Sequence, residues 1–326
     1  MNNPTPRLAR TILDVIGNTP LVELGRCVEA QRAGRRGRLL AKLETFNPGS
    51  SKKDRIALEI VREARAEGLL RPGQTVVELT SGNTGTGLAI VCRALGHPFV
   101  ALISRGNSVE RVRQMAALGA EVIVVDQGPG SIPGQVSGDD LARVEEETAR
   151  IVAERDAFRV DQFARAANVL AHERHTGPEI WEQSGGQVDV FVDLVGTGGT
   201  FTGVSRALRR LKPELRAYVV EPLGAAVLAG RPVTDPRHKL QGAGYSRADL
   251  PLLDRSLVTD YIQVRDQDAI EAARFLAAQE GIFAGFSTGA HLAAAWQLLD
   301  DREAGATIAF LVCDSGLKYL STDLFD

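Results

Sequence analysis

Three glycine-rich segments, each placed between an apolar run and a helical pattern, restrict the folds that this chain can adopt. They are Thr80-Ser81-Gly82-Asn83-Thr84-Gly85, Gly196-Thr197-Gly198-Gly199-Thr200 and Gly285-Phe286-Ser287-Thr288-Gly289. In open α/β sheets, the loops that lead from the carboxyl end of a strand into a helix carry the ligand site. We therefore expect an α/β protein in which these loops meet around one ligand.

The apolar runs predict strands that are buried on both faces. Most of them are continuous rather than alternating in polarity, which is typical of parallel strands covered by helices on both sides. The predicted strands are Thr75–Leu79, Phe99–Ile103, Glu121–Val125, Val188–Val195, Ala217–Val220 and Thr307–Val312. Helices are predicted between them, including the amphipathic segments Asp54–Glu67 and Asp139–Glu154. This alternation predicts open, doubly wound sheets.

The length and composition limit the class of protein. With 326 residues, the chain is about twice the commonest domain length, so one large domain or two closely joined domains are expected. Hydrophobic residues (44%) and charged residues (24%) occur in the proportions of a globular protein rather than a disordered one. A formal net charge of -3 provides no basic field for nucleic acid.

Cysteine usage and hydropathy lead to an expectation about location. Cys27, Cys92 and Cys313 are too few and too far apart for a disulfide framework, so a reducing cytoplasm is expected. No apolar stretch is long enough to cross a bilayer, and the first ten residues are polar. We therefore expect a cytoplasmic protein without a membrane or nucleic-acid partner.

The loops that precede predicted helices are suited to anions. Unpaired backbone N–H groups and the positive end of the helix dipole bind phosphate or carboxylate at such positions. For Gly196–Thr200 two interpretations stay open, a phosphate site and a simple turn. A GxGxxG motif would need glycine at the position of Phe201, and no GxxxxGK[ST] loop occurs in the chain.

Two adjacent lysines, Lys52 and Lys53, lie at the start of a predicted helix. The segment reads Asn47-Pro48-Gly49-Ser50-Ser51-Lys52-Lys53-Asp54-Arg55, and its serines are suited to capping. The helix dipole and burial both disfavour an ammonium ion there, which would lower the pKa of such a lysine and leave a nucleophilic amine. The alternative is a pair of solvated surface lysines, since lysine is rarely buried.

Two further features are interpreted as structural. His172-Glu173-Arg174-His175 is no zinc-protease motif, because HExxH would need its second histidine at Thr176, and we expect no metal. Cys313 follows a predicted buried strand and is interpreted as a small core residue.

Read together, five ordered segments resemble the cysteine synthase family of pyridoxal-phosphate enzymes. They are NPGSSKKDR, TSGNTGTG, VGTGGTFTG, EGIFAGFSTGA and CDSGLKYLST, and the resemblance runs from Ile16 to the end of the chain. It implies the fold-type-II (tryptophan synthase β-like) architecture of two doubly wound open-sheet domains. The expected division is a smaller substrate-loop domain (1–24 and 47–155) and a larger domain that binds the coenzyme phosphate (25–46 and 156–326).

The resemblance also implies roles for individual residues. Lys53 corresponds to the lysine that forms a Schiff base with pyridoxal 5'-phosphate, because it immediately precedes Asp54-Arg55; Lys52 departs from the small or apolar residue usual before it. Adjacent helical residues diverge by about 100°, so both lysines cannot point into one site. The other implied contacts are Asn83 for the coenzyme ring oxygen, Gly196, Thr197, Gly198, Gly199 and Thr200 for its phosphate, Ser287 for its pyridine nitrogen, and Thr80, Ser81, Thr84 and Gln162 for the substrate carboxylate.

The reaction implied is β-replacement on an activated serine. A neutral hydroxyl such as that of Ser287 makes the coenzyme ring a weaker electron sink than an aspartate would, which disfavours transamination. We expect O-acetylserine or O-phosphoserine to react with sulfide to give L-cysteine, on a homodimer. The alternatives are a cystathionine β-synthase or diaminopropionate-type synthase that uses another nucleophile, and a non-catalytic regulatory member of the fold.

Two segments depart from the family pattern. Ser104-Arg105-Gly106-Asn107-Ser108 replaces the usual Pro-Glu pair, and Arg105 is interpreted either as a contact for an anionic substrate or as a solvent-facing side chain. The Gly-, Pro- and Ser-rich segment Gln127–Gly138 is longer than usual and predicts a flexible loop or lid.

Overall fold

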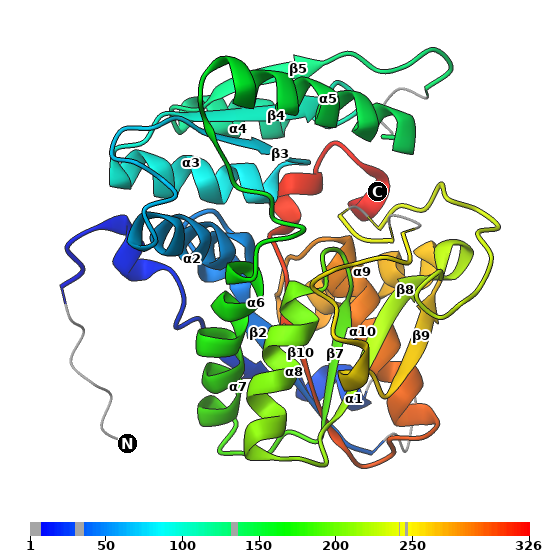
Figure 1. The fold of residues 1–326 in the computed structure, drawn as a ribbon. Coiled ribbons are helices and arrows are strands. Elements are labelled where there is room, and N and C mark those ends of the chain that lie inside the picture. The colour runs from blue at the N-terminus through cyan, green and yellow to red at the C-terminus, as the bar shows by residue number, and fades with distance from the viewer. Residues whose placement is uncertain (1–7, 30–35, 132–135, 241, 245–246) are drawn as a thin grey trace.

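Two sheets organise the chain (Figure 1). The computed structural model describes residues 8–29, 36–131, 136–240, 242–244 and 247–326. A six-stranded sheet has the order β1-β2-β10-β7-β8-β9, and a four-stranded sheet has the order β5-β4-β3-β6. The strands are β1 (Leu21–Glu23), β2 (Arg38–Leu43), β3 (Val76–Leu79), β4 (Phe99–Ser104), β5 (Glu121–Val125), β6 (Phe158–Arg159), β7 (Val190–Leu194), β8 (Arg216–Pro222), β9 (Asp260–Val264) and β10 (Thr307–Val312).

The strand pairs are parallel, with one exception at an edge. β1 pairs antiparallel with β2, whereas every other described pair is parallel. Helices connect the parallel strands, as such crossovers require. They are α1 (Gly25–Glu29), α2 (Lys53–Ala66), α3 (Asn83–Leu95), α4 (Val109–Ala117), α5 (Gly138–Glu154), α6 (Ala167–Ala171), α7 (Gly177–Gln183), α8 (Gly199–Leu211), α9 (Asp266–Glu280) and α10 (Phe286–Asp300). The predicted α/β class with two doubly wound open sheets is confirmed.

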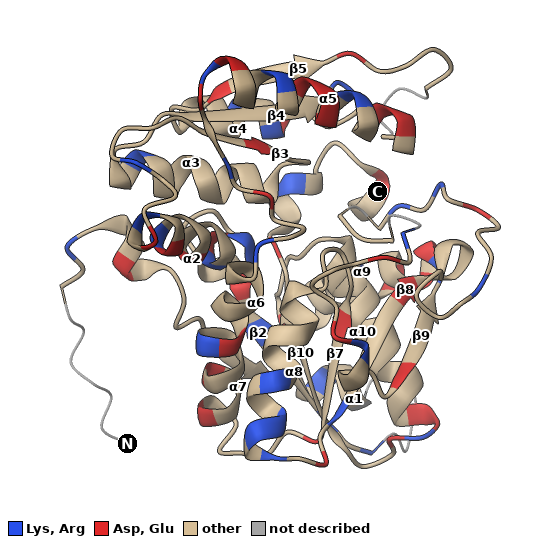
Figure 2. Cartoon of the chain, in the orientation of Figure 1, with Lys and Arg blue, Asp and Glu red and all other residues tan. Residues whose placement is uncertain are grey.

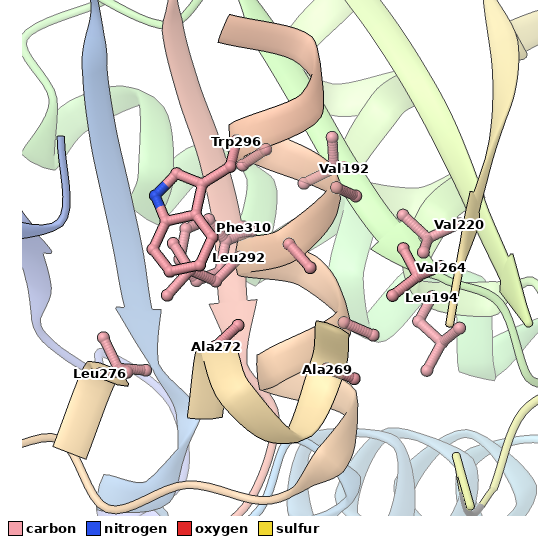
Figure 3. Close-up of a cluster of buried hydrophobic side chains, with 14 of the residues drawn as sticks. Val192, Leu194, Val220, Val264, Ala269, Ala272, Leu276, Leu292, Trp296 and Phe310 are labelled. Atoms are coloured by element: carbon pink, nitrogen blue, oxygen red, sulfur yellow. The ribbon is translucent and has the colours of Figure 1, made fainter. Parts of the chain in front are cut away.

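Both sheets are covered by helices on their two faces, which explains the continuous apolar runs. In the six-stranded sheet, Val192 packs with α9 and α10 on one side (Figure 3). Its neighbour Phe191 packs on the other side against Phe201 of α8, with ring centroids 6.5 Å apart. In the four-stranded sheet, α3 and α4 cover one face, with α2 packed on α3, and α5 covers the other.

Strand pairing differs from the predicted domain division at two short strands. β1 lies within residues 1–24 but joins the six-stranded sheet, and β6 lies after residue 156 but joins the four-stranded sheet. These strands have three and two residues, so their sheet is set by the backbone partner rather than by an apolar pattern of their own. The division into two domains otherwise stays a proposal.

The predicted loop before α5 is anchored where it is described. Residues 132–135 lie outside the described residues, but the carboxylate of Asp140 accepts hydrogen bonds from Gln127, Gly128, Ser131 and Ser137. Ser137 also caps α5 through the Asp140 N–H, so the helix begins at Gly138, one residue before its predicted start. One buried carboxylate therefore fastens both sides of this loop to α5.

Charged residues of both signs are spread over the helices and loops of the chain (Figure 2). Along α5, for example, arginines lie between aspartates and glutamates rather than on a face of their own. Within the described ranges, no helix combines the length and the apolar character needed to cross a bilayer.

Candidate active site

The start of α2 is attached to the carboxyl end of β10. Ser51 forms an antiparallel bridge with Asp314, and the Lys52 N–H donates to the Cys313 carbonyl at 2.9 Å. The predicted capping serine contributes, because Ser51 Oγ accepts from the Lys53 N–H at 3.3 Å. The two sheets therefore meet where Lys53 begins its helix.

Lys53 carries the amine that the sequence predicted to be nucleophilic. Its side chain is half-buried, and no hydrogen bond joins its Nζ to another of the described residues. Burial, and after it the positive charge of Lys52, lowers the pKa of Lys53 to about 8. A substantial fraction of this amine is neutral at mildly alkaline pH, as a nucleophile requires.

The pKa of Lys52 is raised, whereas that of Lys53 is lowered. The prediction that a lysine at this helix start has a lowered pKa is therefore wrong for Lys52. Its Nζ lies 3.1 Å from Oδ1 of Asp193, which is buried at the carboxyl end of β7. Burial disfavours the charged form of Lys52, but the negative charge of Asp193 outweighs burial and raises the pKa. The prediction failed because the partner is 141 residues away in the sequence.

The first glycine-rich loop lies beside the first turn of α2. A Cβ added to Gly87 on α3 would lie 3.1 Å from the carbonyl oxygen of Lys53, so the two helices are in direct contact. Thr80 Oγ1 accepts from the N–H groups of Gly82 and Gly85, both at 3.0 Å, and this holds the turn into α3. Thr80 thus shapes the loop, whatever else it contacts.

Two predicted substrate contacts from distant segments meet at this loop. The Thr84 hydroxyl donates to Gln162 Oε1 at 2.7 Å, and both side chains are buried. Ser81 is half-buried, and its carbonyl oxygen accepts from Arg111 Nη1 at 2.5 Å. The structure therefore brings Thr80, Ser81, Thr84 and Gln162 together at the start of α3.

Asn83, the first residue of α3, is held by two charged residues near the carboxyl terminus. Its amide nitrogen donates to Asp314 Oδ2 at 2.7 Å, and its oxygen accepts from Lys318 Nζ at 2.6 Å. Burial lowers the pKa of Lys318. The second oxygen, Asp314 Oδ1, is buried without a hydrogen-bond partner among the described residues. Neither contact was predicted from the sequence.

The second glycine-rich loop joins β7 to α8 and has the geometry of an anion cradle. Gly198 has φ +88, and a Cβ at this position would lie 2.7 Å from the backbone nitrogen of Leu253, so a larger residue is excluded. Thr197 Oγ1 accepts from the Gly199 N–H at 3.3 Å and from the Asn168 amide at 3.1 Å. Because a 13-residue helix begins here, its dipole favours an anion at this loop.

The last residue of this loop contacts a buried histidine. Thr200 Oγ1 lies 3.2 Å from Nε2 of His172, whose Nδ1 lies 3.0 Å from Thr176 Oγ1. His172 is in a one-turn π-helix (His172–Thr176), and burial lowers its pKa well below the usual value. Both ring nitrogens are therefore engaged by hydroxyls. Among the described residues, no three His, Cys, Asp or Glu side chains gather as a metal site would require.

The third glycine-rich loop also meets the end of β10. The Gly285 N–H donates to the Asp314 carbonyl at 3.3 Å, and a Cβ at Gly285 would lie 2.3 Å from the Tyr319 ring. Ser287 is half-buried in the first turn of α10, and its neighbour Thr288 accepts from the Cys313 N–H at 3.1 Å. Cys313 itself is a buried free thiol, so its interpretation as a core residue is confirmed.

These contacts connect the three loops to one another and to the start of the helix that carries Lys53. The Asn168 amide donates to the Gln162 carbonyl at 2.7 Å as well as to Thr197, which joins the first loop to the second. The ion pair between Asp193 and Lys52 joins the end of β7 to the start of α2. Asp314 joins the start of α2 to Asn83 and to the third loop. The three loops and the start of α2 are therefore linked to one another by hydrogen bonds and one ion pair.

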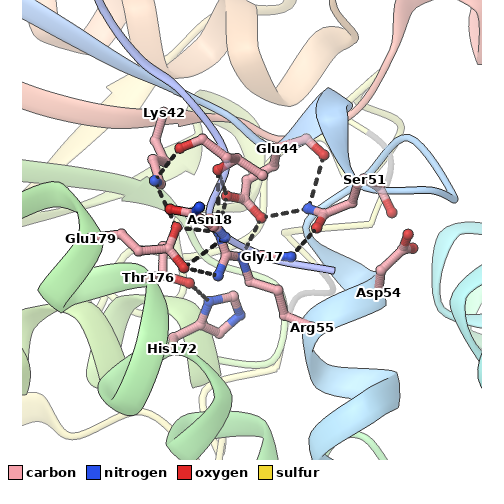
Figure 4. Close-up of polar contacts among 12 residues, drawn as sticks. Gly17, Asn18, Lys42, Glu44, Ser51, Asp54, Arg55, His172, Thr176 and Glu179 are labelled. Atoms are coloured by element: carbon pink, nitrogen blue, oxygen red, sulfur yellow. Dashed lines mark hydrogen bonds and ion pairs between the residues drawn. The ribbon is translucent and has the colours of Figure 1, made fainter. Parts of the chain in front are cut away.

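A network of buried charges fixes the orientation of α2 (Figure 4). Arg55 contacts Glu44 at 2.6 Å and Glu179 at 2.7 Å, and Lys42 contacts Glu179 at 2.7 Å. The Arg55 and Lys42 side chains are almost completely buried. Because β2, α2 and α7 each contribute a charge, this network fixes the helix that carries Lys53 against the six-stranded sheet.

The sequence did not identify four residues of the site. Asp193 lies within a predicted strand and Asn168 in a segment without a motif, so neither stood out. Asp314 and Lys318 both stand in one of the family-like segments, CDSGLKYLST, and this is the signal that could have found them.

An amine of lowered pKa, on a helix linked to a glycine-rich helix start, suits a ligand that carries both an aldehyde and an anionic group. Comparison with known proteins agrees with this. A family model described as pyridoxal-phosphate dependent enzyme matches residues 12–314. The chain belongs to this family and uses pyridoxal phosphate.

Individual relatives cover almost the whole chain. An O-ureido-L-serine synthase from Streptomyces lavendulae is 40% identical over 98% of this chain and 93% of its own length. Cysteine synthase A from Escherichia coli is 39% identical over 95% of this chain and 93% of its own length. An O-acetylserine sulfhydrylase isoform 3 from Entamoeba histolytica superposes with a TM-score of 0.90 at 34% identity, covering 100% of this chain and 94% of that one. The protein is thus an enzyme of the β-replacing, cysteine synthase-like kind.

The residues present fit this coenzyme. Lys53 supplies a neutral amine for its aldehyde, and the Gly196–Thr200 loop supplies a helix N-terminus for its phosphate. Ser287 lies at the start of α10 and Asn83 at the start of α3, both attached to the end of β10 through neighbouring hydrogen bonds.

Proposed function

We propose that the protein replaces the leaving group on the β-carbon of O-acetylserine or O-phosphoserine with sulfide and releases L-cysteine. The observation that carries this proposal is the convergence of three loops around Lys53, whose pKa is lowered to about 8. The identity of 39% with a cysteine synthase over 95% of the chain supports the choice of product.

The bound coenzyme supplies electron withdrawal from the α-carbon of the amino-acid substrate. In our proposal, the Lys53 amine would hold the coenzyme aldehyde before the substrate binds and would then remove the α-proton of the substrate as general base. After loss of the β-substituent and addition of the nucleophile, Lys53 returns a proton to the α-carbon. A pKa of about 8 suits both steps, since a base and its conjugate acid are then both present near neutral pH.

The loops would hold the rest of the complex. The N-terminus of α3 with Ser81, Thr84 and Gln162 would bind the substrate carboxylate, and Thr80 would hold the turn of that loop. The Gly196–Thr200 loop would hold the coenzyme phosphate. Asn83 and Ser287 would contact the coenzyme ring, and the neutral hydroxyl of Ser287 favours elimination at the β-carbon over transamination.

A second candidate differs only in the nucleophile. The 40% identity with an O-ureido-L-serine synthase over 98% of the chain favours this alternative. An O-ureido-L-serine product would need hydroxyurea, rather than sulfide, as the group that adds to the β-carbon. The same loops and Lys53 would serve either reaction.

The test is to supply donors and acceptors separately to the purified enzyme. Serine, O-acetylserine and O-phosphoserine are added one at a time, and the absorbance of the bound coenzyme is followed. Sulfide, hydroxyurea, thiosulfate, homocysteine and a small amine are then added, and the products are identified by mass spectrometry. Cysteine formed faster than any other product supports the proposal, whereas O-ureido-L-serine formed faster supports the second candidate.

A Lys53→Ala variant is the control. It should bind the coenzyme only noncovalently and show no product. If no donor changes the absorbance of the unaltered enzyme, the proposed β-replacement is wrong. The homodimer and the cytoplasmic location stay predictions, which sedimentation and cell fractionation would check.

A further inference from the structure

The ion pair between Lys52 and Asp193 is buried beside the proposed coenzyme lysine. Its nitrogen and oxygen are 3.1 Å apart, and the side chains are 12% and 2% exposed. Lys52 immediately precedes Lys53, and its backbone is fixed to the end of β10. A charge in this position cannot move away from Lys53 without breaking α2 from the sheet.

Lys52 is the cation that balances Asp193. The other basic group near Asp193 Oδ1 is Nε2 of His291, at 3.5 Å. That nitrogen accepts from the Leu194 N–H at 2.7 Å, while Nδ1 lies 2.8 Å from the Leu311 carbonyl and donates to it. The His291 ring is therefore neutral, consistent with burial lowering its pKa to about 4. His291 lies inside α10 and bonds two strands, β7 and β10.

We propose that Lys52 is a positioning residue whose fixed positive charge, held by Asp193, keeps the adjacent Lys53 amine in its neutral, reactive form. The inference rests on the proposed role of Lys53 as the coenzyme lysine. The Coulomb interaction between two ammonium groups is repulsive and is poorly screened in a buried site, so a charged Lys52 disfavours a charged Lys53.

The groups around Lys53 make the direction of the effect clear. Those that act on it from each neighbouring element are Lys52 before α2, Asp193 on β7, Glu78 on β3 and Cys313 after β10. Two neutral histidines, His172 and His291, lie near Lys52 as well. Lys52 is the one cation in this described set, and the carboxylates favour a protonated Lys53. Removing the Lys52 charge should therefore make Lys53 more basic.

A purely structural role would not require a charged pair. Burying two charges costs desolvation that their attraction often fails to exceed, so an apolar pair of similar volume is often as stable. An ion pair that adds little stability but lies next to the reactive amine is better explained by its effect on that amine. The two roles predict different results for the variants below.

The experiment compares Lys52→Met with Lys52→Arg in the full-length protein after removal of the coenzyme. The reactivity of Lys53 toward trace acetic anhydride is measured against pH, and the modified lysine is located by mass spectrometry. Loss of the charge should raise the midpoint of the Lys53 profile by about one pH unit or more. Lys52→Arg keeps the cation and should keep the midpoint close to that of the parent.

A second readout is the rate at which the same variants capture added pyridoxal phosphate. The coenzyme's own ionisations are common to all variants, so a difference between the pH profiles reports on the protein. An unchanged midpoint in Lys52→Met, or an equal shift in Lys52→Arg, overturns the inference. If Lys52→Met does not fold, the neutral pair Lys52→Met with Asp193→Asn replaces it, with a smaller upward shift expected.

The two hypotheses fail separately. Covalent capture that persists in Lys53→Ala would contradict the proposed role of Lys53, whatever the acylation profile shows. Capture that needs Lys53 but shows no dependence on the charge at position 52 would contradict only the present inference.

Discussion

Two desolvated carboxylates in different parts of the molecule, one half-buried and one fully buried, have opposite ionisation behaviour. Glu179, at the junction of α7, β2 and α2, is desolvated, but hydrogen bonds from Arg55 and the charge of Lys42 outweigh this and lower its pKa to about 2. Glu78, in the four-stranded sheet, accepts from the backbone N–H groups of Asp161 and Gln162. Burial raises its pKa to about 7. Both carboxylates are desolvated. Their pKa values differ because Glu179 is in contact with cations, whereas Glu78 has none in contact among the described residues.

The contrast extends to the ion pairs of the two regions. At the junction, Lys42, Arg55 and Lys52 form buried pairs with carboxylates of other elements. In the four-stranded unit, pairs such as Arg105–Asp126 and Arg155–Glu121 are exposed to solvent. Changes of charge should therefore have large effects at the junction and small effects on the four-stranded unit.

The largest effect is expected for Arg55→Met. The substitution leaves Glu44 and Glu179 without the guanidinium that contacts both, and it should lower the free energy of unfolding by about 3–5 kcal/mol. Urea unfolding followed by circular dichroism measures it. The control is Arg174→Met. It removes an exposed ion pair with Glu59, which lies on α2 as Arg55 does, and it should lower the free energy of unfolding by less than about 1 kcal/mol. Equal losses would contradict the contrast.

Glu78→Gln tests the carboxyl that has no cation in contact among the described residues. The quantity measured is the free energy of unfolding as a function of pH. The folded state keeps the Glu78 proton up to about pH 7, whereas the unfolded chain releases it near 4.5. The stability linked to this proton is therefore complete below 4.5 and is lost as the pH rises through 7. Between about pH 5 and about pH 8, the parent should lose up to about 3 kcal/mol that the variant does not lose.

The control for this comparison is Glu121→Gln on the neighbouring strand β5. Hydrogen bonding to Arg155 lowers the pKa of Glu121, so its contribution to stability is complete throughout the same pH range. Parallel stability profiles for the parent and Glu78→Gln would show that Glu78 is ionised in the folded protein, against our expectation.

A smaller effect is expected for Asp140→Ala in the loop before α5. The variant loses the reciprocal cap with Ser137 and the contacts with Gly128 and Ser131, at a cost of about 1–2 kcal/mol. Hydrogen exchange should increase at Gly128 and at the first turn of α5. Asp139→Ala, at the adjacent exposed position, should change neither measurement.

The smallest effect is expected for Arg105→Ala. Arg105 pairs with Asp126 at 2.5 Å, and the two side chains are 63% and 79% exposed. We expect a change in unfolding free energy within about 0.5 kcal/mol and unchanged substrate kinetics. A rise in KM for an anionic donor would instead support the other interpretation of Arg105, as a substrate contact.

Much of the fold and part of the site could be predicted from local sequence. The run Thr307–Val312 predicted β10 because a strand buried on both faces must be apolar throughout. The loops before Asn83, Gly199 and Phe286 each lead into a helix as expected, and Gly82 and Gly198 have a positive φ that other residues would adopt only with strain. The pair Lys52-Lys53 stood out because a lysine at a helix start is unusual, and the resemblance to the cysteine synthase family then proposed Lys53 as the coenzyme lysine.

What the sequence by itself determined is the set of elements, the order of the loops and the position of the two lysines at a helix start. These depend on periodicity, backbone geometry and short spacings, which act over a few residues. The tertiary structure decided which charges meet: that Lys52 faces Asp193, that Asn83 lies between Asp314 and Lys318, and that Glu78 has no cation in contact among the described residues. Ionisation depends on burial and on charges a few ångströms away, and those neighbours come from distant parts of the chain.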